Sequence, residues 1–290
     1  MTDLETRDLL ARLRSAESVR GSENFPVALR ALPERRRRQL HALYAYARFV
    51  DDVGDEPLFG VGQGDRLAAL DVVEAQLRDL YAGRPIAMAA IAGLGPVVAA
   101  RRLPMDPFLR LLEANRVDQR TLRYETFDQL IDYCSLSANP VGELVLHMFT
   151  EPTPEQVALS DRVCTALQII EHLQDVGQDR RRGRIYLPAE DLRRFDVAES
   201  DLDRPAAGRT LRALLAFEAE RARARLEAGA PLVSTLRGWA RLSVSAYIAG
   251  GRAALAALQR ADYDSLSTAP KADARSVVGQ WLAATVRSPG

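Results

Sequence analysis

Hydrophobic residues recur along the chain with the three- and four-residue spacing of amphipathic helices, and no segment alternates polar and apolar residues over a strand length. Short breaks rich in Gly, Pro and Asp separate these segments, and none is long enough to link two domains. We therefore predict one all-α domain over residues 1–290, with its core at about 15–260. The predicted helices cover 34–55, 65–82, 107–121, 127–147 with an interruption at Asn139-Pro140, 205–228, 232–260 and 272–286.

Three helix starts carry capping signals. Asp106-Pro107 predicts an N-cap before a proline at the first helical position, and Thr126 with Gln129 has the spacing of a capping box. Thr153-Pro154 with Gln156 combines both signals. It opens the longest pattern, which runs to about Arg182, stops at Gly183 and predicts a helix of roughly 40 Å.

Composition and charge narrow the function. Lys+Arg and Asp+Glu are both 39, so the chain has no basic excess to neutralise phosphates, and this argues against nucleic-acid binding as its main task. Two cysteines, Cys134 and Cys164, and the absence of a signal-like start indicate a reducing cytosol. The longest apolar run, 86–100, is too short to span a bilayer, which leaves a peripheral membrane contact open.

Two acidic segments share one spacing. "YAYARFVDDVGDEP" (44–57) contains Asp51 and Asp55, and "QIIEHLQDVGQDRRRGRIYLP" (168–188) contains Asp175 and Asp179. Residues four apart lie on one helix face, so each pair presents two carboxylates in one direction. Acids crowded at a helix C-terminus repel one another and meet the negative end of its dipole, so their presence needs a reason.

A third pair, Asp128 and Asp132, has the same spacing and serves as a comparison, because we expect it to be merely solvated. The two segments above differ from it by a Val-Gly step, and a glycine inside a helix costs about 1 kcal/mol against alanine. Such a cost suggests that something approaches the backbone closely. Arginines also flank both segments: Arg48 before the first, and Arg180, Arg181, Arg182 and Arg184 after the second.

Carboxylate pairs among arginines suit a metal-complexed diphosphate. Mg²⁺ takes one or two carboxylates and completes its octahedron with phosphate oxygens and water, and arginine binds the remaining oxygens. Taken alone, each pair also fits a helix end with solvated acids. His41, His147 and His172 have neither di-iron nor zinc spacing, so we assign them no role.

The segments "ALYAYARFVDDVGDE", "YCSLSANPVG" and "ALQIIEHLQDVGQDRRRGRIYLP" resemble, in this order, the motifs of the squalene/phytoene synthase family. The resemblance covers roughly 18–247. It implies a single-domain isoprenoid-synthase helical bundle around a central cavity, which acts with Mg²⁺ on a prenyl diphosphate such as presqualene or farnesyl diphosphate. "SENFPVALRALP" (22–33) and "SANPVG" (137–142) are most similar to the hydroxysqualene synthase branch, which ionises presqualene diphosphate and adds water.

By matched position, the resemblance implies site residues. Metal ligands would be Asp51, Asp55, Asp175 and Asp179, with Asp52 a weaker candidate. Ser22, Arg48 and the arginines after Asp179, Arg182 among them, would contact phosphate oxygens, and Tyr44, Gln168 and Tyr247 would line the pocket near the cation. Asn139 is a candidate for placing the water. Glu171 stands where many members carry asparagine, so it would add a metal ligand or pair with an arginine.

Three functions stay open. The first is hydroxysqualene synthase, the second a sibling that condenses two prenyl diphosphates, and the third a non-catalytic isoprenoid-binding subunit. No Gly-rich dinucleotide motif follows a strand, so we predict no nicotinamide cofactor. We expect a cytoplasmic protein, open to contact with the inner membrane face and with sibling enzymes of the pathway. "RRRR" (35–38) reads as a solvated helix face that could touch anionic lipid heads.

Overall fold

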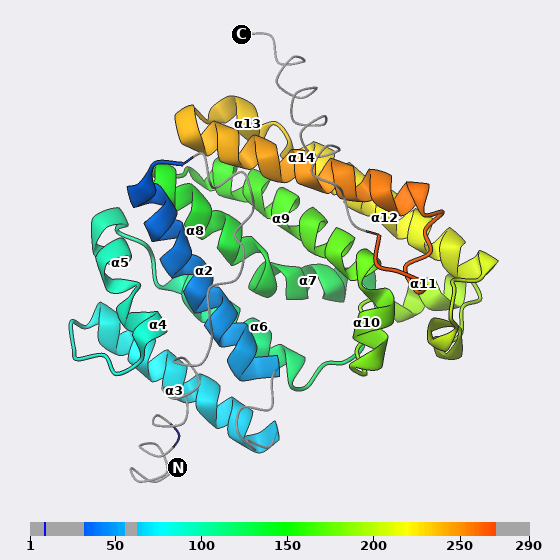
Figure 1. Cartoon of the computed structure of the whole chain (residues 1–290), viewed down its shortest axis with the longest axis horizontal. Helices are drawn as coiled ribbons and strands as arrows, with labels where there is room; N and C mark the ends of the chain where they lie inside the picture. The colour runs from blue at the N-terminus through cyan, green and yellow to red at the C-terminus, as the bar shows by residue number, and fades with distance from the viewer. Residues whose placement is uncertain (1–8, 10–31, 56–62, 271–290) are drawn as a thin grey trace. The chain divides into compact units, whose positions relative to one another are not determined.

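The computed structural model describes residue 9, residues 32–55 and residues 63–270. Every regular secondary-structure element in these ranges is a helix (Figure 1). One isolated parallel bridge pairs Arg123 with Ile185. The all-α prediction is therefore confirmed for the described part of the chain, while the predicted helix at 272–286 lies outside it. Among the described helices, none is both long and apolar enough to cross a membrane.

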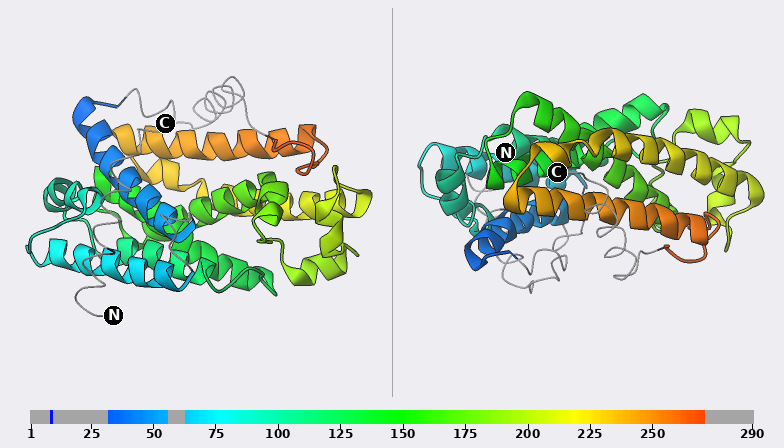
Figure 2. Two further views of the ribbon diagram at one scale, coloured as in Figure 1. Left: turned by 60° about the horizontal axis from the view of Figure 1, so that its bottom comes forward. Right: turned by 90° about the horizontal axis from the view of Figure 1, so that it is seen from above.

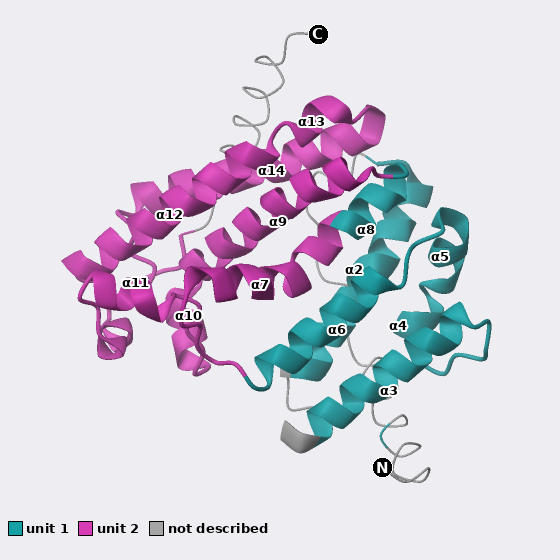
Figure 3. Ribbon diagram, turned by 180° about the vertical axis from the view of Figure 1, so that it is seen from behind, with its two compact units in different colours: residues 1–120, 143–151 teal, residues 121–142, 152–290 magenta. Residues whose placement is uncertain are grey.

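The chain divides into two compact units, which Figure 3 shows in different colours. The first comprises Met1–Arg120 and Glu143–Glu151, and the second comprises Thr121–Gly142 and Pro152–Gly290. Each unit is described by itself below, and the single-domain prediction stays a prediction. The first unit holds α2 (Glu34–Asp55), α3 (Gln63–Tyr81), α4 (Ala89–Ala92), α5 (Gly95–Arg101), α6 (Asp106–Asp118) and the later part of α8 (Asn139–Phe149).

Helices α2, α3 and α6 pack against one another in the first unit. Tyr46, which is fully buried, stacks edge-on against Phe108 with ring centroids 5.1 Å apart, and its hydroxyl donates to the Phe108 carbonyl at 3.1 Å. This satisfies the one polar atom that the tyrosine brings into the core. Leu144 and Met148 of α8 belong to the same buried cluster. The aromatic pair thus ties the middle of α2 to α6.

In the second unit, α9 is the helix on which the others pack. Its neighbours α12 and α14 lie beside it in both views of Figure 2. Side chains on Gly229 or Gly251 would overlap Val163 or Leu167 of α9, so these glycines let α12 and α14 approach closely. The unit holds α7 (Phe127–Ser137), the start of α8, α9 (Pro154–Gln174), α10 (Val176–Arg181), α11 (Ala189–Arg194), η3 (Glu199–Asp203), α12 (Arg209–Gly229), α13 (Leu232–Thr235) and α14 (Gly238–Arg260).

The capping signals are largely confirmed. Thr126 and Thr153 both accept a hydrogen bond from the backbone three residues on, and Gln156 closes a complete capping box. The prediction at Asp106 was wrong by one position: Met105 is the N-cap, and Asp106 is the first helical residue. Instead of capping the helix, the Asp106 carboxylate forms an ion pair with Arg110 one turn later, at 2.8 Å on the helix surface.

A buried acidic cluster joins α11 to α12. Arg221 contacts Asp191 at 2.6 Å and Glu218 at 3.1 Å, and both carboxyl groups are almost fully buried. Burial, followed by the hydrogen bond with Asp191, raises the pKa of Glu218 to about 8 against the opposing charge of Arg221. The Arg221 guanidinium also lies over the rings of Phe127 and Phe217. One arginine therefore holds the segment that follows the second acidic motif against α12.

Candidate active site

The first acidic segment closes α2, which begins and ends at the residues predicted for it. Asp51 is exposed, whereas Asp52, Val53 and Gly54 are buried. Asp51 and Asp55 are both helical, so their backbones have the predicted spacing of one turn. The side chain of Asp55 and all of Ser22 lie outside the described residues.

Two carboxamides, one on the neighbouring helix α6 and one at its C-cap, hold this segment. Asn115, which is buried, donates from Nδ2 to Asp51 Oδ1 at 3.1 Å, and Gln119 donates from Nε2 to the Gly54 carbonyl at 2.8 Å. The second bond satisfies a carbonyl that the helix end leaves unpaired. A Cβ on Gly54 would overlap the Asn115 amide. The sequence predicts a close neighbour of the Gly54 backbone, and this neighbour is the Asn115 side chain of α6.

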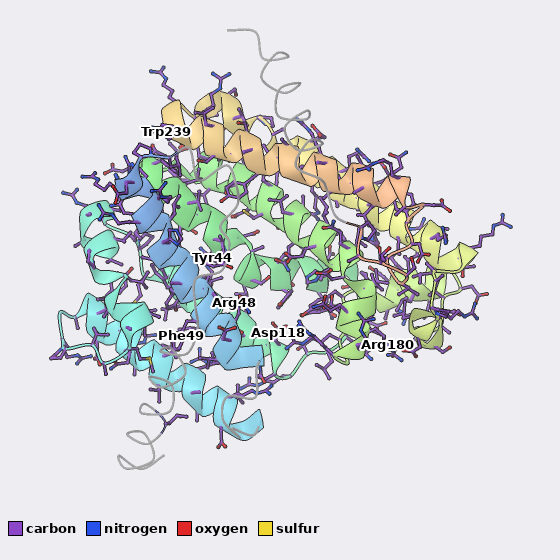
Figure 4. The ribbon with its side chains drawn as sticks, viewed as in Figure 1. Tyr44, Arg48, Phe49, Asp118, Arg180 and Trp239 are labelled. Atoms are coloured by element: carbon purple, nitrogen blue, oxygen red, sulfur yellow. The ribbon has the colours of Figure 1, made fainter. Side chains whose placement is uncertain are left out.

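Arg48 and Tyr44 lie one turn apart on α2, as Figure 4 shows. Arg48 Nε contacts Asp52 Oδ1 at 3.1 Å, and about half of the arginine side chain reaches solvent. Tyr44 is 39% exposed, a large value for an aromatic residue. On this helix Arg48 and Tyr44 thus precede Asp51 by about one and two turns, and the Arg48 guanidinium engages Asp52.

The second acidic segment lies at a break between two helices. One continuous helix to Arg182 was predicted, and this was wrong: α9 ends at Gln174, and α10 begins at Val176. Asp175 stands between them with φ −104° and ψ 15°. Aspartate favours such helix ends because its side chain competes for backbone partners. The Asp179 amide still donates to the Asp175 carbonyl at 2.8 Å, so the one-turn relation of the two acids survives the break.

Gly177, in the second segment, has a different role from Gly54. A Cβ there would meet its nearest neighbours at 3.5 Å, which is ordinary van der Waals contact. The prediction of a close approach at this glycine was therefore wrong for the described residues. Gly177 instead lies in the first turn of α10, just after the helix break.

A third carboxyl group, Glu171, precedes Asp175 by one turn of α9. Solvent reaches the side chain, but surrounding protein removes much of its hydration, and this burial raises its pKa. The carboxylates of Asp175 and Asp179 raise that pKa further, while His172 opposes them. Three acids therefore share one patch of negative potential, which favours a bound cation.

The arginines after Asp179 do not share one environment. Arg180 contacts Asp203 at 2.8 Å and Glu199 at 3.0 Å, and Glu199 also contacts Arg123 at 2.8 Å. This ion-pair network fastens α10 to η3. Arg182 is exposed at the end of α10. Arg180 is therefore already engaged by two carboxylates, whereas Arg182 is better placed to meet a mobile anion.

One face of α9 changes in chemistry along its length. Cys164, Gln168, Glu171 and Asp175 follow at spacings of three and four, and solvent reaches each of them to some degree. Tyr247 of α14 lies close to Cys164 and is 36% exposed, yet surrounding protein raises its pKa. This face of α9 is therefore apolar near Cys164 and acidic toward Asp175.

Asn139 stands at the break between α7 and α8, as its sequence predicted. Its Oδ1 accepts a hydrogen bond from Thr165 Oγ1 of α9 at 2.9 Å, and both residues are buried. A side chain on the nearby Gly142 would overlap Ser160 and Cys164, so the start of α8 lies tightly on α9. The pair Asn139–Thr165 is thus a fixed, buried polar group, and Thr165 directly follows Cys164 on α9.

The donor set fits a divalent cation bound together with a phosphate. Among the described residues, no three of His, Cys, Asp and Glu gather closely enough to hold a metal alone. Mg²⁺ is bound in this incomplete manner, by one or two carboxylates with substrate oxygens and water. Hard oxygen ligands of this kind do not suit zinc or copper sites.

Three contributors were missed at the level of sequence. Asn115 and Gln119 are polar residues four apart at buried positions of an amphipathic helix, a signal that could have marked them. His172 received no role, although it lies one turn from Gln168. Its Nε2 is 3.1 Å from Gln168 Nε2, and its Nδ1 is 3.9 Å from Asp179 Oδ2.

A model of the squalene/phytoene synthase family matches residues 18–280. The chain belongs to the squalene/phytoene synthase family. A hydroxysqualene synthase of Rhodopseudomonas palustris is 36% identical over 231 residues, which are 79% of this chain and 76% of that protein. A 15-cis-phytoene synthase of Synechococcus elongatus is 31% identical over 261 residues, which are 85% of this chain and 83% of that protein.

Solved structures agree with this membership. Squalene synthase HpnC from Alicyclobacillus acidocaldarius aligns with TM-score 0.77 at 40% identity, over 90% of this chain and 97% of that one. A dehydrosqualene synthase in complex with ligand aligns with TM-score 0.81 at 26% identity, over 98% and 97%. The squalene/phytoene synthase family acts on prenyl diphosphates, generally with a divalent metal. The chain is therefore an all-α isoprenoid-synthase enzyme of this class.

Proposed function

We propose that this family member is a hydroxysqualene synthase, which converts presqualene diphosphate and water to hydroxysqualene and diphosphate. The observation that carries the proposal is the buried Asn139–Thr165 pair at the α7–α8 break, because water capture requires a fixed polar group at the hydrocarbon end. The relatives named hydroxysqualene synthase support it.

The acidic segments would hold the diphosphate end, with Asp51, Asp55, Asp175 and Asp179 as the carboxylates that receive Mg²⁺. When bound, Mg²⁺ supplies a Lewis acid that neutralises charge on the leaving diphosphate. Arg48 and Arg182 donate to the remaining phosphate oxygens, and Arg48 is held near by Asp52. Placing these donors in advance lowers the cost of separating charge as the C–O bond breaks.

The apolar end must accept a carbocation without trapping it. Burial raises the pKa of Cys164 to about 12, so the thiol stays protonated and is a poor nucleophile. The raised pKa of Tyr247 likewise keeps a neutral phenol, whose ring face attracts a cation. Tyr44 would add a second ring. Asn139 would place one water, whose oxygen bonds to the rearranged cation while its proton leaves with diphosphate or solvent.

A sibling function is the second candidate. The chain would then condense two prenyl diphosphates, and the 15-cis-phytoene synthase and the dehydrosqualene synthase among its similar proteins favour this. The acidic segments serve both reactions and do not separate them. A non-catalytic subunit ranks last, because both segments keep their acids.

The deciding experiment is a product analysis. Purified protein with Mg²⁺ receives presqualene diphosphate in one reaction and farnesyl diphosphate in another, with an Asp51→Asn/Asp175→Asn variant as the control. We expect a C30 alcohol from presqualene diphosphate only, with its oxygen derived from H₂¹⁸O. A hydrocarbon or presqualene diphosphate made from farnesyl diphosphate would assign the condensing role instead.

We also propose a peripheral contact with an anionic bilayer at the start of α14. Trp239 and Leu242 are 38% and 40% exposed beside the exposed Arg237 and Arg241, and aromatic and basic groups together suit a lipid interface (Figure 4). Trp239→Ser/Leu242→Ser should weaken sedimentation with phosphatidylglycerol vesicles. The control is Leu122→Ser, because Leu122 is 47% exposed but its neighbour Arg123 is paired with Glu199. Equal loss in both variants would contradict the proposal.

A further inference from the structure

His172 occupies a constrained place on α9, one turn before the break at Asp175. The imidazole is buried and lies nearly flat on the ring of Tyr186, with centroids 3.7 Å apart and planes 12° from parallel. Tyr133 approaches the same ring with a centroid distance of 6.3 Å. The stack therefore fixes the plane of the imidazole, so its two nitrogens have defined directions.

The two nitrogens of His172 face different groups. Nε2 lies 3.1 Å from the Gln168 amide nitrogen, and Nδ1 lies 3.9 Å from Asp179 Oδ2. An amide nitrogen donates and cannot accept, so Nε2 accepts and the imidazole proton resides on Nδ1. This tautomer points an N–H at the Asp179 carboxylate. The opposite tautomer would aim a lone pair at that carboxylate and is disfavoured by repulsion.

We propose that His172 is a positioning residue, which orients the Asp179 carboxylate and the Gln168 amide at once. This inference rests on the proposed function, because Asp179 is a metal ligand only there. The distance of 3.9 Å from His172 Nδ1 to Asp179 Oδ2 is longer than a hydrogen bond. The hydrogen bond forms when the Asp179 carboxylate rotates as it binds the cation. Drawing one carboxylate oxygen to Nδ1–H leaves the other for the cation, as outer partners do in metal sites.

The surroundings of His172 support a polar role beyond packing. His172 and Asp179 line one small hollow of about 10 Å³ together with Arg184 and Tyr186. Glu171 and Asp175 add carboxylates to the same patch, and they compete with Asp179 for any cation. A directed N–H on Asp179 selects which oxygen of that carboxylate faces inward. Gln168, held at the other nitrogen, lies on the α9 face that Cys164 and Glu171 share.

Three substitutions separate the contributions of the ring. In His172→Asn the amide nitrogen reaches the place of Nδ1 and keeps an N–H directed at Asp179, whereas in His172→Gln it reaches the place of Nε2. His172→Phe keeps only the stack on Tyr186. His147→Phe is the matched control, because His147 lies on α8 in the other compact unit.

The primary readout is binding of Mn²⁺ with inorganic diphosphate, followed by electron paramagnetic resonance without turnover. We expect His172→Phe to weaken this binding roughly 10- to 100-fold, as losses of outer partners do, and His172→Asn to restore most of it. The Mg²⁺ concentration for half-maximal rate should rise in parallel, with a smaller change in KM for the prenyl substrate. Equal affinity in wild type and His172→Phe would overturn the proposal.

Two further measurements keep the outcomes distinct. If wild type itself binds no Mn²⁺ with diphosphate, the proposed function fails, and this inference fails with it. If His172→Phe does not fold, the Asn and Gln variants still decide, because only a positioning role separates them. In ¹⁵N-histidine protein with only three histidines, the His172 signals should show the proton on Nδ1. The opposite tautomer would also overturn the assignment.

Discussion

The two acidic segments share the run Asp-Val-Gly and a pair of acids four residues apart, yet the protein supports them differently. The first closes one helix and is held by Asn115 and Gln119, which reach Asp51 and Gly54 from α6. The second straddles a helix break, where His172 Nδ1 of α9 lies 3.9 Å from Asp179 Oδ2 of α10. A similar spacing of acids is therefore not a similar structure: a distant part of the chain contacts the first segment, whereas His172 lies only seven residues from Asp179 in the second.

The largest expected effect comes from removing the acids. Asp51→Asn and Asp175→Asn should each lower kcat/KM about 10²- to 10³-fold, because each removes charge that stabilises the leaving diphosphate. Product formation under saturating Mg²⁺ measures the loss. Asp128→Asn/Asp132→Asn is the matched control, since both of these residues are exposed on α7 with the same spacing. A comparable loss in the control would remove the distinction between functional and solvated pairs.

A smaller effect separates the two glycines. Gly54→Ala should lower the free energy of unfolding by about 1 to 3 kcal/mol, because its methyl group overlaps the Asn115 amide. Gly177→Ala should be neutral or stabilising by up to about 1 kcal/mol, since its Cβ finds ordinary contacts within a helix. Urea unfolding of both variants tests the pair. Asn115→Ala should relieve the Gly54→Ala penalty, and equal penalties at the two glycines would contradict the comparison.

The smallest effect concerns charge at the second segment. The folded pKa of Glu171 is raised, so the folded state holds its proton more tightly than the unfolded state. Stability from this group is present below its ordinary pKa and is lost as pH rises through the folded pKa. Glu171→Gln should therefore gain stability relative to wild type over that window, by less than about 1.4 kcal/mol because solvent reaches the side chain. Unfolding from pH 4 to pH 8 measures it, and a constant difference would contradict the sign.

What could be predicted from sequence was mostly local. Thr126 and Thr153 could be predicted as helix starts because a cap and its hydrogen-bond partner lie three residues apart in the chain. The break at Asn139 follows from a proline beside it. The support of Asp51 could not be predicted in this way, because Asn115 is far away in the chain and its contact depends on how α6 packs on α2.

The break at Asp175 shows the opposite difficulty. Periodicity continues across it, because the apolar residues on both sides suit one helix, and only the backbone angles of Asp175 reveal the change of direction. The ion-pair partners of Arg180 were equally hidden, since Glu199 and Asp203 belong to a short 3₁₀ helix that no pattern predicted. Residue types were thus predictable, whereas their partners depended on packing.

The division between the compact units falls inside α8, after Gly142. Leu144 and Met148 complete a buried cluster whose other members precede Arg120 in the chain. During synthesis, the ribosome must therefore add all of Thr121–Gly142, which belongs to the other unit, before this first core can close. A nascent chain that ends before α8 therefore leaves part of the apolar surface of this cluster uncovered.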